Sequence, residues 1–489
     1  MINVLLPEIL VATGLLGLLT IYVCLDKKYH GSMVVGIVLL YALTFWELSG
    51  LTVPDSPIVW WEGLFVYDGL SQTSKMLIMA TMVVISVCAH AEQRDFSFPG
   101  IEFYSLMGFS ALGMMVTVSA GHVISLFVGL ELMYLPLYAL VMMRKKNAQA
   151  QEAAIKYIIL GALATAFLLY GASLLYAVTG SMHFEDIHGI LSGIGGDSGW
   201  QGRIPEIDNY PIINVASLLI LAAILFKLGV MPFHIWVPDV YQGASNVVVA
   251  TIASLPKLVL VVVWCRVFGD TGALAPLIDS WQWPVLVIGV GSILLGNLAG
   301  LAQTNIKRML AYSSISHMGL LLLALGLGTR EGIAACWIYI IGYMVMTVTI
   351  FAALARCRQS GREAVLIEEM KGLYHSHRGY AVVLIVSLFS LMGMPPFLGF
   401  FVKIQVLMAL IHGGKAGLAL VAVLGSVIGA FYYLRVIQNI LFYRKDATGK
   451  AVEIVPDRGS DVVLFLATVA VGVSGLVPIW LLTLAKMAG

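Results

Sequence analysis

Residues 226–234 read Phe-Lys-Leu-Gly-Val-Met-Pro-Phe-His and place a glycine, a proline and a lysine inside an apolar run that covers 212–234. Residues 392–403 do the same inside a second apolar run, 380–411, with the sequence Met-Gly-Met-Pro-Pro-Phe-Leu-Gly-Phe-Phe-Val-Lys. Proline in a helix interior removes a backbone hydrogen bond, which lipid tolerates only where the freed carbonyl faces protein or a wet cavity. Paired breaks of this kind in two halves of a chain indicate an inverted-repeat transporter with its ion site at the breaks. A kink that only shapes packing is the plainer interpretation, but the lysine beside each break argues against it.

The whole chain is apolar. Of its 489 residues 60% are hydrophobic and 11% are charged, and the mean hydropathy is +0.93. A soluble protein carries about 25% charged residues, and a helix that crosses a bilayer needs about 20 apolar residues. We therefore predict an all-α polytopic membrane protein with about fourteen transmembrane helices, of which the seventh and twelfth are broken. The predicted spans are 2–24, 31–49, 72–90, 102–119, 122–142, 153–179, 212–234, 247–268, 282–303, 308–328, 332–355, 380–411, 416–441 and 461–484.

Basic residues are unevenly divided between the loops of these spans. Seventeen lysines and arginines fall in loops on one side, and three (Arg203, Arg330 and Lys415) fall in loops on the other. Because positive loops stay in the cytoplasm, we predict that the basic side is cytoplasmic and that both termini are periplasmic. A bacterial inner (plasma) membrane is the expected location, and an organellar inner membrane is the less favoured one.

The regions between the spans exclude several classes of function. No stretch outside the spans is long enough for a core of its own, so catalysis on a soluble substrate would need another polypeptide. The glycines form no phosphate-binding motif. The five cysteines are scattered without pairing and indicate neither a metal site nor a disulfide framework.

Ionisable residues inside the predicted spans carry the functional argument. Each costs roughly 2.5–3.5 kcal/mol at mid-bilayer, so such residues face the protein interior and tend to be functional. Those that fall near the midplane are Glu131, Lys227, Lys257, His317 and Lys403, while Lys156 lies near the cytoplasmic start of the sixth span. A layer at one depth suits proton transfer sideways through the protein, with half-channels to each face.

A structural interpretation of these charges stays open beside the functional one. Glu131 and one lysine would then form a static ion pair, but one glutamate cannot neutralise four lysines. For His234 and His317 the interpretation as satisfied core histidines is equally strong. A haem held by two histidines is disfavoured, because no two histidines fall at clamping positions on evidently facing helices.

Six motifs identify a family. The chain resembles subunit N of proton-translocating NADH:quinone oxidoreductase, or respiratory complex I, over nearly its whole length. The motifs that carry the resemblance lie at 128–132 (Val-Gly-Leu-Glu-Leu), 154–157 (Ala-Ile-Lys-Tyr), 226–243, 303–319, 399–403 and 431–435. Lysine at 403 favours subunit N, since other antiporter-like subunits can carry glutamate there. The stretch Ala-Ser-Asn-Val at 244–247 departs from the proline-rich run that is usual in the family.

The resemblance implies an antiporter-like fold with two inverted five-helix repeats. Helices 1–3 would occupy 1–100, the first repeat (helices 4–8) 101–268, the second (helices 9–13) 269–445, and helix 14 would occupy 446–489. Its partners would be the other membrane-arm subunits and the lipid bilayer. It would bind no cofactor, since NADH, FMN, iron–sulfur clusters and quinone belong to partner subunits.

The resemblance also implies a role for each charged residue. Glu131 would modulate Lys227, the input proton carrier, and Lys257 would connect it to Lys403 on the exit side. Lys156 would lie near the cytoplasmic uptake point, and His234 and His317 would bridge the carriers through water. Two alternatives remain: a homologous subunit of a multisubunit Na⁺/H⁺ antiporter, membrane-bound hydrogenase or F420H2-type dehydrogenase, or a scaffold whose role is assembly.

Overall fold

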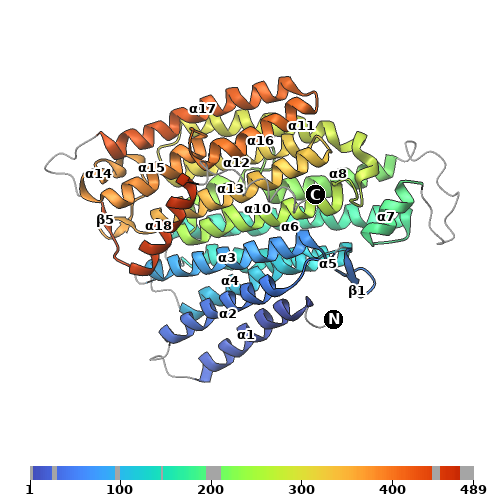
Figure 1. Cartoon of the computed structure of the whole chain (residues 1–489), viewed down its shortest axis with the longest axis horizontal. Helices are drawn as coiled ribbons and strands as arrows, with labels where there is room; N and C mark the ends of the chain where they lie inside the picture. The colour runs from blue at the N-terminus through green and yellow to red at the C-terminus, as the bar shows by residue number, and fades with distance from the viewer. Residues whose placement is uncertain are drawn as a thin grey trace.

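The computed structural model describes residues 4–24, 30–54, 56–93, 100–144, 147–193, 211–442 and 452–473 as a bundle of long helices that run side by side (Figure 1). The helices are α1 (Leu6–Cys24), α2 (His30–Gly50), α3 (Gly69–Gln93), α4 (Gly100–Val118), α5 (Val123–Met142), α6 (Ala148–Thr179), α7 (Phe184–Leu191), α8 (Pro211–Leu228), α9 (Trp236–Gly243), α10 (Asn246–Phe268), α11 (Ile278–Leu301), α12 (Ile306–Leu325), α13 (Arg330–Leu354), α14 (Leu373–Ser376), α15 (Arg378–Met392), α16 (Leu398–His412), α17 (Ala416–Leu441) and α18 (Arg458–Val473). Short strands occupy the ends of the bundle: β1 (Ile58–Trp60) pairs with β2 (Phe65–Tyr67), and β3 (Cys357–Gln359) pairs with both β4 (Arg362–Glu363) and β5 (Glu453–Ile454).

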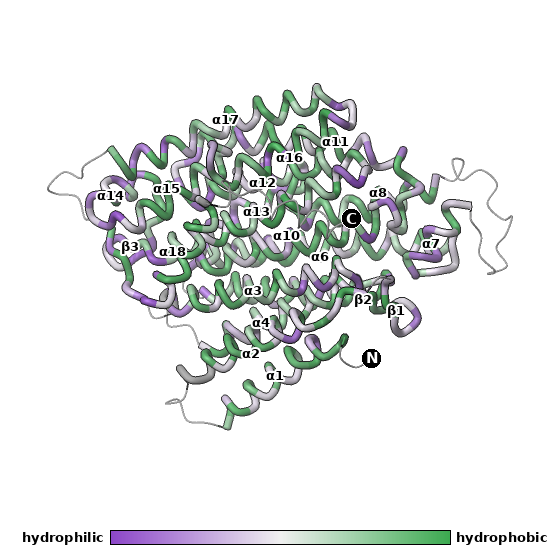
Figure 2. The backbone as a smooth tube through the Cα atoms, viewed as in Figure 1, coloured by the Kyte–Doolittle hydropathy of each residue, from purple (hydrophilic) through white to green (hydrophobic). Residues whose placement is uncertain are grey.

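Hydropathy changes along the length of the helices, which are apolar in the middle and hydrophilic at the ends. Within the described ranges, 11 helices are long and apolar enough to cross a membrane, and three shorter apolar helices accompany them. Figure 2 shows apolar residues along the middle of the bundle and hydrophilic residues gathered at its two ends, around α14 and β3 at one and around α7 and β1 at the other. The predicted all-α membrane class is confirmed. The number of fourteen spans, the two inverted repeats and the segment boundaries stay predictions, and the last predicted span continues beyond the described residues.

Helix α10 lies at the centre of the bundle. Its apolar length is entirely buried, whereas only 17% of the corresponding window of α1 is buried. Helices α3, α4, α5, α8, α9 and α13 all pack against α10. A helix that is apolar all round can be stable only when other helices surround it or lipid does. Lys257, on α10, is therefore surrounded by protein side chains and not by lipid.

The two predicted breaks are confirmed, and they share one backbone geometry. Helix α8 ends before Gly229 and α15 ends before Gly393, and both glycines adopt positive φ, +74° and +88°. The N–H of Gly229 bonds to the carbonyls of Leu225 and Phe226, and the N–H of Gly393 bonds back to the corresponding carbonyls of α15. This is the left-handed helix end for which glycine is suited. The chain then resumes as α9 and α16, respectively.

Side chains satisfy carbonyls that the breaks release. The indole Nε1 of Trp236 donates to the carbonyl of Phe226 at 3.0 Å. The ammonium of Lys403 donates to the carbonyls of Leu391 and Met392, each at 2.9 Å. A cation at the C-terminal end of a helix is also favoured by the helix dipole. Lys403 therefore has a structural function at the end of α15 in addition to any role in proton transfer.

A buried cluster of charges joins several helices at the end that holds β3. Glu363 lies 3.0 Å from Arg144 and 3.6 Å from Lys307, and it also accepts a bond from the Asn246 amide. Glu92 accepts bonds from the first two backbone N–H groups of α10, each at 3.0 Å. Burial works to raise the pKa of the Glu363 carboxyl, but the Lys307 and Arg144 cations outweigh it and hold that pKa well below its usual range. This cluster fixes the starts of α10 and α12 against β4.

Substitution of Gly393 tests the geometry of the second break. In Gly393→Ala, the new Cβ would lie 2.9 Å from Lys403 Cδ, and the backbone would keep a left-handed conformation that costs a side chain about 1–2 kcal/mol. We expect a lower melting temperature of the purified protein in detergent. Gly379→Ala on the same helix is the control, because its Cβ meets nothing within 4 Å. Equal melting temperatures for both variants would contradict the assignment.

Substitution of Glu363 tests the charge cluster. Glu363→Gln leaves Arg144 and Lys307 buried beside a neutral group, which should cost roughly 3–5 kcal/mol of stability at neutral pH. Because the pKa of Glu363 is lowered by folding, its stabilisation is present above the unfolded-state pKa of about 4.3 and is lost as the pH falls through the folded-state value. Thermal melting from neutral to acidic pH should therefore show the two proteins converging only in acid. The exposed Glu368→Gln serves as the control, and a deficit that does not depend on pH would contradict the electrostatic cause.

Candidate functional site

The predicted site residues differ in how deeply the structure buries them. Lys227, Lys257 and His317 are 5%, 3% and 6% exposed, so each is a core residue. Glu131 and Lys403 are half-buried. Glu131 lies on α5 between Val128 and Leu135, which are 50% and 58% exposed, so it reaches the flank of the bundle rather than its centre. The predicted role of Glu131 stays a prediction.

A threonine connects Glu131 with Lys227. Thr165, on α6, donates its hydroxyl proton to Oε1 of Glu131 at 2.7 Å. The ammonium of Lys227, on α8, lies 3.5 Å from the same hydroxyl oxygen and 4.1 Å from the ring centroid of Tyr134. No direct ion pair between Glu131 and Lys227 occurs in the described part of the chain. The interaction between the predicted carboxylate and the predicted input carrier therefore runs through a hydroxyl group.

Lys257 is surrounded by hydroxyl groups and aromatic rings. Its ammonium donates to the hydroxyl of Ser314, which also contacts the hydroxyl of Tyr241 at 3.2 Å. The rings of Tyr343 and Tyr241 lie 5.3 and 6.0 Å from Nζ, within the range of cation–π attraction. Among the described residues no carboxylate forms an ion pair with Lys257. A change of its protonation state therefore breaks no salt bridge.

His317 lies one turn after Ser314 on α12 and continues the series toward Lys403. Its Nδ1 contacts the hydroxyl of Tyr339 at 2.5 Å, and its Nε2 contacts the hydroxyl of Tyr433 at 3.1 Å. His317 and Lys403 line the same small cavity, with a volume of about 20 Å³. That volume is enough for one water molecule between two polar groups. Residues three apart on a helix share a face, so α12 presents Ser314 to Lys257 and His317 to Lys403.

Lys156 belongs to a more exposed ionic group at the end of α9. Its ammonium lies 2.5 Å from Glu152 and 2.8 Å from Asp239, and Arg308 lies 2.9 Å from the other oxygen of Asp239. The side chain of Lys156 is 39% exposed. Arg308 follows Lys307 at the start of α12, and Lys307 belongs to the charge cluster around Glu363. The ionic group of Lys156 therefore lies at the same, basic end of the bundle.

His234, like Lys156, makes no hydrogen bond or ion pair with the other predicted residues in the described part of the chain. It lies half-buried in the break between α8 and α9, where its backbone carbonyl accepts a bond from Val237. No hydrogen bond of the described residues joins it to Lys227 or Lys257. The bridging role that was predicted for His234 stays a prediction.

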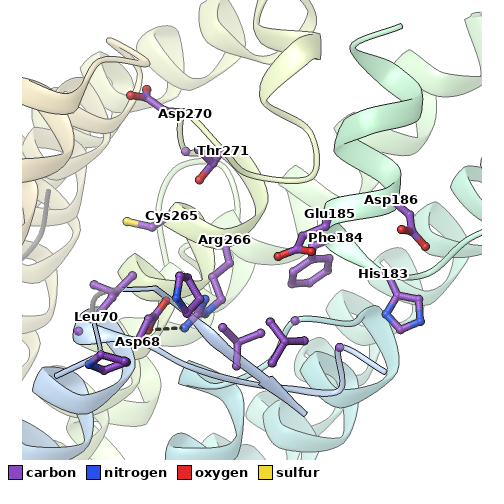
Figure 3. A pocket seen from close by; sticks show the side chains of 18 of the residues that line it. Asp68, Leu70, His183, Phe184, Glu185, Asp186, Cys265, Arg266, Asp270 and Thr271 are labelled. Atoms are coloured by element: carbon purple, nitrogen blue, oxygen red, sulfur yellow. Dashed lines mark hydrogen bonds and ion pairs between the residues drawn. The ribbon is translucent and has the colours of Figure 1, made fainter. Parts of the chain in front are cut away.

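A cavity lined partly by Asp68, His183 and Arg266 is a different feature. It has a volume of about 1030 Å³, and none of the seven predicted residues lines it. Figure 3 shows its wall, with an ion pair between Asp68 and Arg266 at 3.0 Å and with His183, Glu185 and Asp186 nearby. Within the described ranges, no group of three or more His, Cys, Asp or Glu side chains is placed to hold a metal ion. The charged layer and this cavity are therefore separate parts of the molecule.

Known proteins share both the sequence and the fold. The model of the family described as "NADH:quinone oxidoreductase/Mrp antiporter, TM" matches residues 120–429. NADH-quinone oxidoreductase subunit N of Azoarcus sp. strain BH72 is 36% identical over 99% of this chain and 98% of its own length. The same subunit of Laribacter hongkongensis is 39% identical over 86% of this chain and 82% of its own length. The chain belongs to the NADH-quinone oxidoreductase subunit N family.

Solved structures place this subunit N family member in the antiporter-like fold. A chain of respiratory complex I from Thermus thermophilus with bound aureothin superposes with a TM-score of 0.79, at 29% identity, over 99% of this chain and 100% of that chain. A chain of the Mrp complex from Dietzia sp. DQ12-45-1b gives the same TM-score at 22% identity, over 99% of this chain and 96% of that chain, and so supports the fold alone. The resemblance predicted from the six motifs is confirmed.

Sequence reasoning found the charged residues of this subunit N chain and missed the hydroxyl groups between them. Ser314 and Tyr433 lie inside motifs that carried the resemblance, but they were given no role. Thr165 and Tyr339 lie outside every motif. Ser314 precedes His317 by three residues, and that spacing could have indicated a shared face. For Thr165 and Tyr339 the sequence holds no such signal, because their partners come from other helices.

Substitution of Tyr433 tests the contacts of His317. Tyr433→Phe removes the hydroxyl that reaches both His317 Nε2 and Ser313. We expect proton translocation to fall about tenfold, the effect of losing one hydrogen bond of ~1.4 kcal/mol in a rate-limiting step. The measurement is proton uptake by membrane vesicles that contain the whole complex. Tyr104→Phe is the control, since that buried hydroxyl bonds only to the carbonyl of Ser86 on the neighbouring helix α3. Equal translocation by the two variants would remove Tyr433 from the pathway.

Proposed function

We propose that this chain is a proton-translocating membrane-arm subunit of an NADH:quinone oxidoreductase. The observation that carries the proposal is a set of titratable side chains inside the bundle whose partners are hydroxyl groups: Glu131 and Lys227 share Thr165, Lys257 bonds Ser314, and His317, which lines a small cavity with Lys403, bonds Tyr433. The membership in the subunit N family agrees with this function. Lysines that are buried without carboxylate partners lower stability, so their retention argues for a role in which their charge changes.

Each residue has a proposed part in proton transfer. Lys156 and its ionic group would take up protons at the basic end, and Lys227 would receive them under the influence of Glu131. Lys257 would pass them on through Ser314 and His317, and Lys403 would release them toward the opposite face. His234 would bridge through water when the break between α8 and α9 changes shape. Transfer then runs mainly along the plane of the membrane.

The chemistry that drives the transfer would lie in partner subunits. We propose that this chain holds no redox centre, and that NADH, flavin, iron–sulfur clusters and quinone are bound by other subunits of the complex. The other membrane-arm subunits and the lipid would surround it. Coupling would reach the lysines through electrostatic interactions along the charged layer, since a charge that appears at one carrier changes the proton affinity of the next.

We also propose the orientation in the membrane. The end with β3 holds Arg144, Lys307, Arg308, Arg356 and Arg358, which supports a cytoplasmic location for it. The opposite end, with α7 and β1, would face the periplasm of a bacterium, together with both termini. The protein would be a multi-pass protein of the inner membrane.

Neutralisation of the carriers tests the function. In the intact complex, Lys227→Ala and Lys403→Ala should each abolish proton translocation while the subunits still assemble. The measurement is acidification of inverted membrane vesicles after addition of NADH, with assembly followed on a native gel. Lys415→Ala is the control, because Lys415 lies near the ring of Trp283 outside the charged layer. Normal translocation by either carrier variant would refute the proposal, and lost assembly without a separate pumping defect would favour the scaffold.

A cation/proton antiporter is the second candidate, because the family model that matches residues 120–429 includes the Mrp antiporters in its description. Purification of the tagged protein from its native membrane and mass spectrometry of its partners separate the two. Flavin and iron–sulfur subunits with NADH-oxidising activity support the oxidoreductase. Antiporter-type membrane subunits alone would move the chain to the cation/proton antiporters.

A further inference from the structure

We infer that Thr165 is a proton-transfer residue: its hydroxyl group passes a proton between Lys227 and Glu131. This inference rests on the proposed function and adds a third residue to the input site. The family resemblance implies that Glu131 modulates Lys227, without any group between them. The structure instead places a group between them that can both donate and accept a hydrogen bond.

The hydroxyl group of Thr165 lies between the carboxylate of Glu131 and the ammonium of Lys227. Thr165 comes from α6, between Glu131 of α5 and Lys227 of α8, and the threonine itself is 9% exposed. Its O–H points at Oε1 of Glu131 over 2.7 Å, and its oxygen faces the ammonium of Lys227 over 3.5 Å. Three helices thus converge on one oxygen atom, and the direction of the bonds runs from lysine to threonine to glutamate.

The orientation of Thr165 differs from that of other threonines in the bundle. Thr117, Thr179 and Thr349 each donate to the carbonyl four residues earlier in their own helix, at 2.7, 2.8 and 2.7 Å. For Thr165 the equivalent contact with the carbonyl of Gly161 is 3.3 Å, longer than its bond to Glu131. The Thr165 hydroxyl therefore lies closer to the carboxylate than to the carbonyl of its own helix.

The transfer balances without an unstable intermediate. The hydroxyl proton of Thr165 moves to Oε1 of Glu131 as an ammonium proton of Lys227 moves to the threonine oxygen. The O–H bond of Thr165 breaks and re-forms, so threonine is unchanged. Lys227 becomes a neutral amine, and Glu131 becomes a carboxylic acid. One proton has moved, the summed charge of the pair stays zero, and two charges have been removed from a medium in which they are costly.

The hydroxyl group rather than the shape of Thr165 is the feature to test. Thr165→Val keeps the branched shape and removes the hydroxyl, and Thr165→Ser keeps the hydroxyl. In vesicles with the whole complex, we expect Thr165→Val to translocate protons about tenfold more slowly, as for the loss of one hydrogen bond to a charged group, and Thr165→Ser to stay near the parent. Thr349→Val is the matched control, because it removes a buried hydroxyl that bonds only to its own helix.

Several outcomes would overturn the inference. Normal translocation by Thr165→Val would do so, and so would equal loss in Thr165→Val and Thr165→Ser, which would make shape the cause. If Thr165→Val fails to assemble on a native gel, Thr165→Ala replaces it, and the same comparison with serine applies. Proton translocation by Lys227→Ala is measured in parallel. If Lys227→Ala is defective and Thr165→Val is normal, the role of Thr165 is refuted and the proposed function stands. If Lys227→Ala translocates protons normally, the proposed function itself is refuted.

Discussion

Within a bilayer, every backbone carbonyl that a helix break releases has to find a donor inside the protein, and the rest of this molecule is arranged around that requirement. At the first break the Phe226 carbonyl accepts from the N–H of Gly229 and from the indole of Trp236, and at the second the ammonium of Lys403 bonds the carbonyls of Leu391 and Met392. The glycines at 229 and 393 let the chain turn at these points. The breaks place polar backbone groups close to Lys227 and Lys403 along the chain. The second break and the lysine that bonds its carbonyls therefore answer the same constraint.

Two kinds of buried charge coexist in the bundle, and their partners distinguish them. Around Glu363, cations and carboxylates are matched at short range, which is the arrangement of a static structural cluster. Lys75 and Glu8, 2.6 Å apart, form a second matched pair between α3 and α1. Lys257, by contrast, contacts a serine hydroxyl and aromatic rings. A matched pair resists a change of charge, whereas a lysine with neutral partners can gain or lose a proton without leaving a counter-ion buried alone.

The sequence predicted the membrane class, the sites of both breaks and most of the charged residues, because these depend on local composition. Proline and glycine in an apolar run determine a break wherever the run is placed, and a lysine at mid-span is conspicuous in any context. Thr165, Tyr339 and Tyr433 could not be predicted in the same way. Threonine and tyrosine are common in membrane helices, and their functional position follows only from which helices pack together. The intermediate burial of Glu131 could not be read from the sequence for the same reason, since the spacing along α5 does not say which flank other helices cover.

The lysines at the two breaks also differ in the groups to which their ammonium protons are hydrogen-bonded. Lys227 precedes its break and leaves the released carbonyl to Trp236, so its ammonium is free to face Thr165. Lys403 follows its break and bonds two carbonyls at once. An ammonium group has three N–H donors, and a neutral amine still has two. Lys403 can therefore give up a proton and keep both carbonyls bonded, although each bond loses the extra strength that a charged donor provides. Loss of a proton from Lys403 would then weaken the hydrogen bonds at the end of α15 without leaving either carbonyl unbonded.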